Sequence, residues 1–354
     1  MLAWELGDRR GGANALRKVK RPDLVPGPGQ AVMGVRATGL GARDLSIMRS
    51  TWPPTQKKVW QNPPPPARFP CQDSAGEILA VGPGVTRVKP GDRVMATHYP
   101  RFIDGPWDFD AMAQEDFGDT QDGFLSEQAL VPAEALVRMP ADYGFEDAAP
   151  LQSSGLTPWR ELTEEAKTKA DETVLTLGSG NVSVFGLQIA KSLGARLILT
   201  SSSDEKLARL RELGADETVN YRNHPDWSRE VMIKIGDRRA DVVRNNIGLA
   251  ALEQCLLSCA SNARIQYISA RPVVGGVAAP APASAQLPNL VARCISIKGY
   301  TVGSRRMFED FVRYIEKTRL KPVIDRVFGF DEVPEAVRYY ETGTKLGKIV
   351  IRVA

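Results

Sequence analysis

Length, composition and charge place this chain among ordinary globular proteins. It has 354 residues, of which 43% are hydrophobic and 25% are charged, and this composition argues against a disordered or collagen-like chain. Two domains are the natural expectation at this length. The 46 basic and 42 acidic residues leave a formal net charge of +4, so no nucleic-acid partner is predicted.

Cysteine usage and the N-terminal segment indicate a cytoplasmic protein. Cys71, Cys255, Cys259 and Cys294 lack the CxxC spacing of a zinc or redox motif, so we expect reduced thiols. The N-terminal sequence MLAWELGDRRGG has charges where a signal peptide needs its apolar stretch. The sequence also lacks the run of about 18 apolar residues that a membrane-spanning helix needs. We therefore expect a soluble chain with no membrane partner.

Residues 1–151 have the pattern of a barrel-like β domain. Prolines and glycines divide them into short segments that alternate apolar and polar residues, such as 30–39, 74–82 and 92–97. Alternation of this kind between turn signals is typical of antiparallel strands. Segment 101–122 has no usable period and is expected to lie outside the sheet.

Residues 152–302 change to short apolar strands separated by helix-length segments. We expect strands at 173–178, 195–200, 217–221, 241–246, 263–269 and 295–302. Apolar strands joined by helical crossovers build parallel βαβ units. The predicted fold class is therefore α/β, with a doubly wound parallel sheet in this domain. A helix at 305–317 and a last strand, KIVIRV, follow, and residues 303–354 are expected to return to the first domain.

A phosphate-binding turn is the strongest local motif. The strand TVLTL runs into Gly178, Ser179 and Gly180, and a helix then begins with Asn181, Val182 and Ser183. Small residues there let backbone N–H groups and the positive end of the helix meet a pyrophosphate. Asn181 departs from the usual glycine but tolerates left-handed backbone. Ser183 departs from the third glycine, so the helix must accommodate a hydroxyl where it packs on the strand.

The end of the second strand favours NADPH as the cofactor. An NAD site usually has Asp or Glu there, to accept from the ribose 2′-OH. This chain has Ser201 and Ser202 instead, with Lys206 one turn later, and hydroxyl donors with a cation suit a 2′-phosphate. Ser203 can also simply cap the next helix. Asp204 leaves NADH open.

Together with this turn, five further stretches resemble one enzyme family. Residues 26–45, 71–94, 155–162, 200–221 and 319–353 resemble the medium-chain dehydrogenase/reductase superfamily, and within it the zinc-independent, quinone-oxidoreductase-like members. The resemblance covers nearly the whole chain. It implies a GroES-like β-barrel catalytic domain, a Rossmann dinucleotide-binding domain, and a homodimer formed through the edge strand of the Rossmann sheet.

The resemblance also implies that zinc is absent. Zinc-dependent relatives hold a catalytic metal with two cysteines and a histidine, at positions that match Gly41, Gln72 and Ser153. None of these supplies a thiolate or an imidazole. The loop that carries four structural cysteines in those relatives corresponds roughly to 101–122, which contains no cysteine.

Three candidate catalytic residues follow from the same resemblance. His98 falls where relatives place a substrate-pocket residue, although it can also be a satisfied histidine of the pocket wall. Tyr99 beside it could donate a proton from its phenol. Asp44 matches a position that braces the site.

The remaining candidates are cofactor contacts. Thr157 and Tyr221 match cofactor-proximal positions of relatives. Asn246, at the carboxyl end of a predicted strand, could hold the nicotinamide carboxamide, or the polar segment 244–246 could signal an altered site. Ser269, at the end of the segment 263–269, completes the expected cofactor set.

These features predict an NADPH-dependent, zinc-independent reductase. It would transfer hydride to an electron-poor C=C or C=O, as in a quinone, an enone or an enoyl thioester, which would be its small-molecule partner. Two alternatives stay open. One is metal-free oxidation of an alcohol with His98 as the proton acceptor. The other is a dinucleotide-binding, non-redox protein on the same scaffold, because segment 244–246 is unusual and positions 41–42 lack a polar side chain.

Overall fold

The chain forms two compact units. The structure, a computed structural model, describes residues 1–7, 11–49, 69–112, 115–236, 238–268, 273–274, 277–278 and 286–354. The first unit comprises residues 1–156 and 302–354, and the second unit comprises residues 157–301. The first boundary thus lies after residue 156, where the sequence pattern had placed it after 151. The return to the first unit begins at residue 302, where the pattern had placed it at 303.

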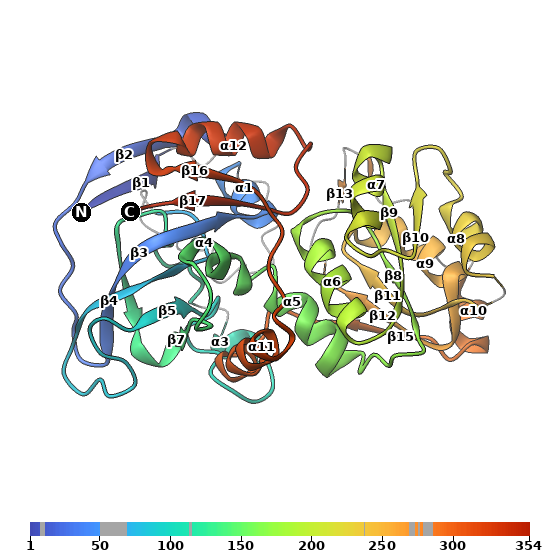
Figure 1. Cartoon of the computed structure of the whole chain (residues 1–354), viewed down its shortest axis with the longest axis horizontal. Helices are drawn as coiled ribbons and strands as arrows, with labels where there is room; N and C mark the ends of the chain where they lie inside the picture. The colour runs from blue at the N-terminus through green and yellow to red at the C-terminus, as the bar shows by residue number, and fades with distance from the viewer. Residues whose placement is uncertain are drawn as a thin grey trace. The chain divides into compact units, whose positions relative to one another are not determined.

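The first unit is built on a mainly antiparallel sheet, with a separate hairpin of β1 and β2 (Figure 1). In the sheet the strand order is β16-β17-β3-β4-β5-β7, and β6 pairs with β3. The strands are β1 (Leu2–Leu6), β2 (Leu16–Lys20), β3 (Gln30–Leu40), β4 (Ala75–Val81), β5 (Arg93–Ala96), β6 (Gln128–Pro132), β7 (Leu136–Arg138), β16 (Ile324–Gly329) and β17 (Lys348–Arg352). The helices are α1 (Ala42–Met48), α3 (Phe109–Met112), α4 (Phe145–Ala148), α11 (Arg305–Thr318) and α12 (Val333–Glu341).

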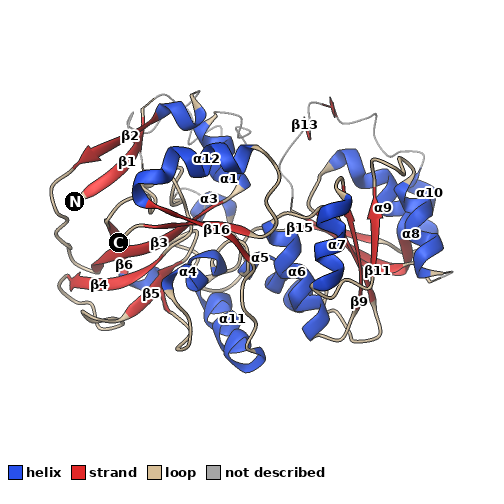
Figure 2. Cartoon of the chain, turned by 45° about the horizontal axis from the view of Figure 1, so that its top comes forward, coloured by secondary structure: helices blue, strands red, loops and turns tan. Residues whose placement is uncertain are grey.

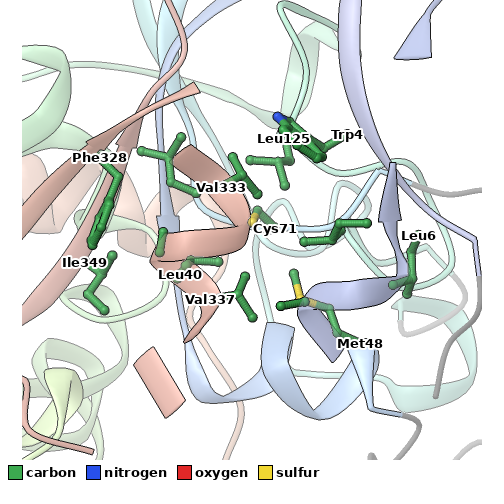
Figure 3. Close-up of a cluster of buried hydrophobic side chains, with 14 of the residues drawn as sticks. Trp4, Leu6, Leu40, Met48, Cys71, Leu125, Phe328, Val333, Val337 and Ile349 are labelled. Atoms are coloured by element: carbon green, nitrogen blue, oxygen red, sulfur yellow. The ribbon is translucent and has the colours of Figure 1, made fainter. Parts of the chain in front are cut away.

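An apolar cluster joins the two ends of the chain in the first unit (Figure 3). Helix α12 presents Val333 and Val337 to this cluster, and both side chains are fully buried. Phe328 of β16 and Ile349 of β17 lie in the same cluster, as does Trp4 of β1. The indole Nε1 of Trp4 donates to the carbonyl of Phe330 at 2.8 Å. The N-terminal hairpin is therefore held by the C-terminal segment.

The second unit is a doubly wound parallel sheet with helices on both faces (Figure 2). Its strand order is β10-β9-β8-β11-β12-β15, and every pair is parallel. The strands are β8 (Thr173–Thr176), β9 (Arg196–Ser201), β10 (Glu217–Asn220), β11 (Ala240–Asn245), β12 (Cys259–Tyr267) and β15 (Ser296–Gly299). Around them lie α5 (Leu156–Trp159), a π-helical turn (Arg160–Glu165), α6 (Asn181–Ser192), α7 (Asp204–Glu212), α8 (Trp227–Ile235), α9 (Leu252–Ser258) and α10 (Leu287–Ala292). A two-stranded ladder joins β13 (Val273–Val274) to β14 (Val277–Ala278).

This strand order puts a topological switch point between β8 and β11. The chain winds outward from β8 through β9 to β10, and then restarts at β11 on the other side. Open sheets of this class bind ligands outside the carboxyl ends of the strands at the switch point. The turn that follows β8 is therefore in the position expected of a dinucleotide site.

The predicted fold class is confirmed, and most expected strands are displaced by only one or two residues at their ends. The segment 263–269 is an exception, because its strand already begins at Cys259. In segment 101–122, the residues that the structure describes contribute only the helical turn α3 and an isolated bridge from Phe117 to Gln121. All four residues of the edge strand β15 are exposed, and the homodimer expected through this edge stays a prediction.

Two further observations bear on the expectations from composition. Cys71, Cys255 and Cys259 are buried free thiols, and Cys294 is an exposed one. Among the described residues, no helix is both long and apolar enough to span a bilayer.

The apolar cluster gives a stability prediction. Replacing Ile349 with Ala removes buried methyl groups from a fully buried position and should lower the free energy of unfolding by roughly 2–5 kcal/mol. Urea unfolding followed by tryptophan fluorescence measures the effect, since Trp4 lies in the same cluster. Arg352→Ala on the same strand is the control, because this exposed side chain pairs only with Glu146 among described residues and should cost about 0.5 kcal/mol or less. Equal losses for the two variants would contradict the assigned cluster.

Candidate functional site

The turn after β8 has the backbone that a phosphate cradle needs. Gly178 adopts a φ of +81°, a left-handed conformation that favours glycine. Gly180 is the N-cap of α6, and a Cβ added there would meet no described atom within 4 Å. No side chain caps this helix end. The first-turn N–H groups of α6 therefore face open space at the positive end of the helix, which suits a pyrophosphate.

Hydroxyl groups from β9 tie this turn to the neighbouring strand. The N–H of Gly178 donates to Thr200 Oγ1 at 3.3 Å, and Ser179 and Ser201 join their hydroxyls at 2.9 Å. The N–H of Tyr221 donates to the Ser201 carbonyl at 3.1 Å. The predicted residues Gly178, Ser179 and Ser201 thus lie together, whereas the Tyr221 side chain is 38% exposed at the end of β10.

Two acidic side chains, Asp204 and Glu205, follow β9 in the first turn of α7, and that of Asp204 is already engaged. Asp204 Oδ1 accepts a hydrogen bond from Asn220 Nδ2 at 2.8 Å. Ser203 caps α7 by accepting from the N–H of Lys206 at 3.3 Å, so the expected cap is confirmed. Ser202 and Lys206 are both partly exposed at this helix start. The candidate ribose-binding segment therefore presents a hydroxyl and a cation.

The remaining cofactor candidates have different surroundings. Thr157 is buried, with 6% exposure. The Nδ2 of Asn246 donates to Ser183 Oγ at 3.1 Å, whereas its Oδ1 is buried and has no hydrogen-bond partner among the described residues, so its role toward a carboxamide stays a prediction. Ser183 in turn donates to the Leu177 carbonyl at 3.2 Å. Ser269 lies outside the described residues.

A fully buried ion pair lies beneath the phosphate turn. Arg244 of β11 and Glu161 of the π-helical turn both have 0% exposure, and Nε of Arg244 donates to Glu161 Oε2 at 2.7 Å. The same guanidinium donates to the Val182 carbonyl at 3.2 Å and reaches Thr176 Oγ1 at 3.4 Å. Burial raises the pKa of Glu161, and Arg244 opposes that rise.

In the first unit, His98 belongs to a second charge cluster. Arg43 contacts Nε2 of His98 and forms an ion pair with Asp116, and Asp119 Oδ2 lies 3.4 Å from the same guanidinium. Burial disfavours the charged form of Arg43, but the carboxylates of Asp116 and Asp119 outweigh it and raise its pKa. Nε2 of His98 lies between this guanidinium, which can only donate, and Asp116 Oδ1 at 3.2 Å, which can only accept when ionised. That nitrogen is therefore occupied.

Tyr99 is fixed by aromatic neighbours. Its ring centroid lies 4.3 Å from that of His98 in an edge-to-face contact, and 4.7 Å from that of Trp107. Trp107 also meets Phe102 at 5.2 Å. Aromatic contacts at these separations hold ring orientation. Of the three tryptophans considered for an aromatic pocket, Trp107 joins this cluster, Trp159 is a buried core residue, and Trp52 lies outside the described residues.

Asp44, the third catalytic candidate, lies beside a buried lysine. Lys348 Nζ forms an ion pair with Asp73 and donates to Ser154 Oγ at 3.2 Å, and both charged side chains are 1% exposed. Asp44 is also 1% exposed, and its Oδ2 accepts from the Gly41 N–H at 2.6 Å. Burial, aided by the charge of Asp73 and opposed by Lys348, raises the pKa of Asp44 to about 7.

The donor set at this place does not fit catalytic zinc. Gly41, Gln72 and Ser153 offer no thiolate or imidazole. A Cβ added at Gly41 would lie 3.8 Å from Lys348 Nζ, so a cation of the chain already occupies the neighbourhood. The described residues contain no group of three or more His, Cys, Asp or Glu side chains that could hold a metal ion.

Sequence reasoning missed the charged partners of these residues. It identified His98 and Asp44 as candidates. It did not identify Asp116 and Asp119, which pair with Arg43, or the pair of Lys348 and Asp73. One signal was present: Arg244 interrupts an apolar strand and Lys348 begins one, and a charge that is buried at such a position must be paired. The identity of the partner needed the structure.

Comparisons with known proteins agree with this architecture. The family model described as alcohol dehydrogenase GroES-like domain matches residues 27–141, and the one described as zinc-binding dehydrogenase matches residues 182–317. A zinc-type alcohol dehydrogenase-like protein of Schizosaccharomyces pombe is 33% identical over 334 residues, covering 92% of this chain and 91% of the relative. An acryloyl-coenzyme A reductase of Metallosphaera sedula is 26% identical and covers 95% of both chains.

Solved structures give the same result. A crystal structure of an NAD-dependent alcohol dehydrogenase superposes with a TM-score of 0.85 at 30% identity, covering 100% of both chains. A crotonyl-CoA carboxylase/reductase in complex with NADP superposes with a TM-score of 0.86 at 19% identity, covering 100% of this chain and 94% of the other, and shows the fold alone. From these matches and the two-unit architecture, the chain belongs to the medium-chain dehydrogenase/reductase superfamily of oxidoreductases.

Proposed function

We propose that this protein is an NADPH-dependent, zinc-independent reductase that transfers hydride to an electron-poor C=C or C=O. The observation that carries the proposal is the turn from Gly178 to Ser183. It joins a left-handed glycine, an uncapped helix start and a hydroxyl network at the switch point of a doubly wound sheet. These features fit a nicotinamide dinucleotide.

The end of β9 supports NADPH over NADH. A 2′-phosphate needs donors and positive charge, and a carboxylate there would repel it. Ser201 and Ser202 supply hydroxyls and Lys206 supplies a cation at the start of α7. The carboxylate of Asp204 accepts from Asn220, and the exposed carboxylate of Glu205 lies in the same first turn of α7. We therefore assign Ser202 and Lys206 to the 2′-phosphate.

Charge balance supports a reductase without zinc. Lys348 and Asp73 neutralise one another in a buried place, and the raised pKa of Asp44 keeps a large share of that carboxyl protonated near neutral pH. The cluster is thus close to neutral without any metal. A divalent cation added beside Lys348 would lack the anionic ligands that buried charge requires.

The chain's own residues would bind and orient the cofactor and stabilise the charge that develops on the substrate. When bound, NADPH supplies the hydride, and the first-turn N–H groups of α6 hold its pyrophosphate. A carbonyl or enone oxygen that gains charge needs a hydrogen-bond donor in place of a Lewis acid. His98 Nε2 is engaged by Arg43 and Asp116, so we assign this donor role to the phenol of Tyr99, whose ring His98 and Trp107 orient.

Names among the relatives support both directions of hydride transfer. The acryloyl-coenzyme A reductase acts on an unsaturated thioester by its name, whereas several relatives are named alcohol dehydrogenases. Alcohol oxidation needs a proton acceptor, and the only described imidazole of the first unit has Nε2 engaged by Arg43 and Asp116 and an Nδ1 that is buried. We therefore favour the reductive direction.

The proposal is tested by cofactor binding and turnover. NADPH fluorescence should rise on titration with the purified protein, and an oxidation screen of quinones, enones and enoyl thioesters should find a substrate. Tyr99→Phe should lower turnover at least about 100-fold, the lower end of what a positioned proton donor contributes, and leave the Kd for NADPH unchanged. Activity should survive chelation. Stoichiometric zinc that is lost together with activity would contradict the zinc-free proposal, and binding without turnover of any substrate would favour a non-redox role.

Lys206→Glu tests the choice between the two cofactors. Removing a charge-assisted contact and adding repulsion should weaken NADPH binding about 10- to 100-fold, which corresponds to roughly 1.5–3 kcal/mol, and leave NADH binding unchanged. Arg211→Glu is the control, because it makes the same charge reversal in the last turn of the same helix. An undiminished preference for NADPH in Lys206→Glu would refute the assignment.

The raised pKa of Asp44 predicts a pH-dependent stability. Its pKa lies near 7 in the folded protein and near the model-peptide value of about 3.9 in the unfolded chain. The folded state therefore binds more protons in this window, so the contribution of Asp44 is fully present below pH 4 and is lost as pH rises through 7. The wild-type protein should lose stability across this window relative to Asp44→Asn, as measured by urea unfolding at several pH values. Asp142→Asn, on an exposed turn, should behave as wild type. Parallel curves for wild type and Asp44→Asn would show that the carboxyl titrates normally.

A further inference from the structure

We propose that Arg244 is a positioning residue for the dinucleotide, which fixes the phosphate-binding turn from below by holding the Val182 carbonyl. The inference rests on the proposed dinucleotide site and assigns the polar segment 244–246 a role in it. Glu161 is the counter-ion that lets a guanidinium occupy this place, and Asn246 holds the same helix turn through Ser183.

The Arg244 side chain connects four elements of the second unit. Arg244 comes from β11, its counter-ion Glu161 from the π-helical turn, and Val182 from the first turn of α6. Nη2 donates to the Val182 carbonyl at 3.2 Å, and Nη1 reaches Thr176 Oγ1 of β8 at 3.4 Å. The side chain thus connects both strands of the switch point to the start of the phosphate-binding helix.

Holding this carbonyl fixes a donor that points toward the phosphate. In a trans peptide the C=O of Val182 and the N–H of Ser183 point in opposite directions. Helix geometry already points the Ser183 N–H toward the open N-terminal end of α6, and a guanidinium that holds the Val182 carbonyl fixes this peptide in that orientation. First-turn N–H groups are the ones that lack intrahelical partners and bind anions.

The helix is adapted to the guanidinium. A Cβ added at Gly186 would overlap Nη1 of Arg244, with Cζ and Nη2 also too close. Only glycine lets α6 lie over the charged side chain. The dinucleotide fingerprint normally uses its third glycine for close packing of helix on strand, and this chain has Ser183 there. In this chain the position at which α6 packs closely on a residue of the sheet lies one turn further along the helix, at Gly186.

Ser183 is accommodated by the same segment. Its hydroxyl donates to the Leu177 carbonyl at 3.2 Å and accepts from Asn246 Nδ2 at 3.1 Å. Asn245 Oδ1 accepts from the N–H groups of Ile247 and Gly248 at 3.1 and 2.8 Å, and so holds the turn that carries Asn246. All three polar residues of 244–246 thus act on the phosphate turn or on its support.

Stability alone gives no reason for this arrangement. Parallel strands buried on both faces are usually apolar, and replacing a buried ion pair by apolar residues of similar volume is often neutral or stabilising. What the pair adds is a directed hydrogen bond at a fixed point of the helix. That contribution predicts a binding defect that can be separated from a folding defect.

The test is the double variant Arg244→Met/Glu161→Met, which removes both charges together and leaves none unpaired. We expect an unchanged or higher Tm, and a Kd about 10-fold weaker for NADPH and for NADH alike, because both carry the same pyrophosphate. Lys206→Glu should instead weaken NADPH alone. Kd values come from nucleotide fluorescence. Arg264→Met/Glu172→Met, which removes a more exposed ion pair of the same unit, is the matched control and should bind both nucleotides as wild type does.

A second measurement does not depend on the cofactor. In the protein without nucleotide, hydrogen exchange in the first turn of α6 should be about 10-fold faster in the double variant, with α7 unchanged. Wild-type Kd values for both nucleotides in the double variant, or unchanged exchange in α6, would overturn the positioning role. A wild-type protein that binds neither nucleotide would refute the proposed function and the cofactor part of this inference, whatever the exchange result.

Discussion

A charge removed from water has to be compensated inside the protein, and this constraint explains the least expected residues of both units. Lys348 with Asp73 in the first unit, and Arg244 with Glu161 in the second, are ion pairs with at most 1% side-chain exposure. An unpaired charge at such a depth would cost several kcal/mol. Each pair lies beside a candidate site. The polar groups around each site therefore serve partly to hydrogen-bond these buried charges.

The two ion pairs impose the same requirement on their neighbours. Lys348 runs past Gly39, where an added Cβ would collide with its Cε, and Arg244 runs past Gly186, where an added Cβ would collide with the guanidinium. Glycine inside a strand or a helix normally costs about 0.5–1 kcal/mol relative to alanine. At these two positions it is needed, because the space next to the backbone is filled by a long cationic side chain. Neither glycine has a positive φ, so steric space is the reason in both cases.

Much of the fold could be predicted from the sequence, because it depends on local patterns. Alternation, Pro and Gly punctuation and apolar runs placed most strands to within one or two residues, and the Gly178 turn was found from its strand and helix context. The charge pairs could not be found this way. Glu161 and Arg244 are 83 residues apart, and a sequence pattern shows that a buried charge needs a partner without showing which residue provides it. The contact between Asn246 and Ser183 could not be found for the same reason, because these residues are 63 positions apart.

Departures from a motif are therefore best judged together with the residues that they contact. Ser183 in the place of a fingerprint glycine would leave a buried hydroxyl beside the strand, but the Leu177 carbonyl and Asn246 satisfy it. Gly41 in the place of a metal-binding cysteine would leave a gap, but Asp44 Oδ2 and Lys348 Nζ lie 3.2 and 3.8 Å from where its Cβ would be. In both places a residue type typical of the family is missing, and polar or charged groups of other residues occupy the space. Such paired changes are what a retained scaffold with an adjusted site requires, since an isolated change would leave either a cavity or an unsatisfied polar group.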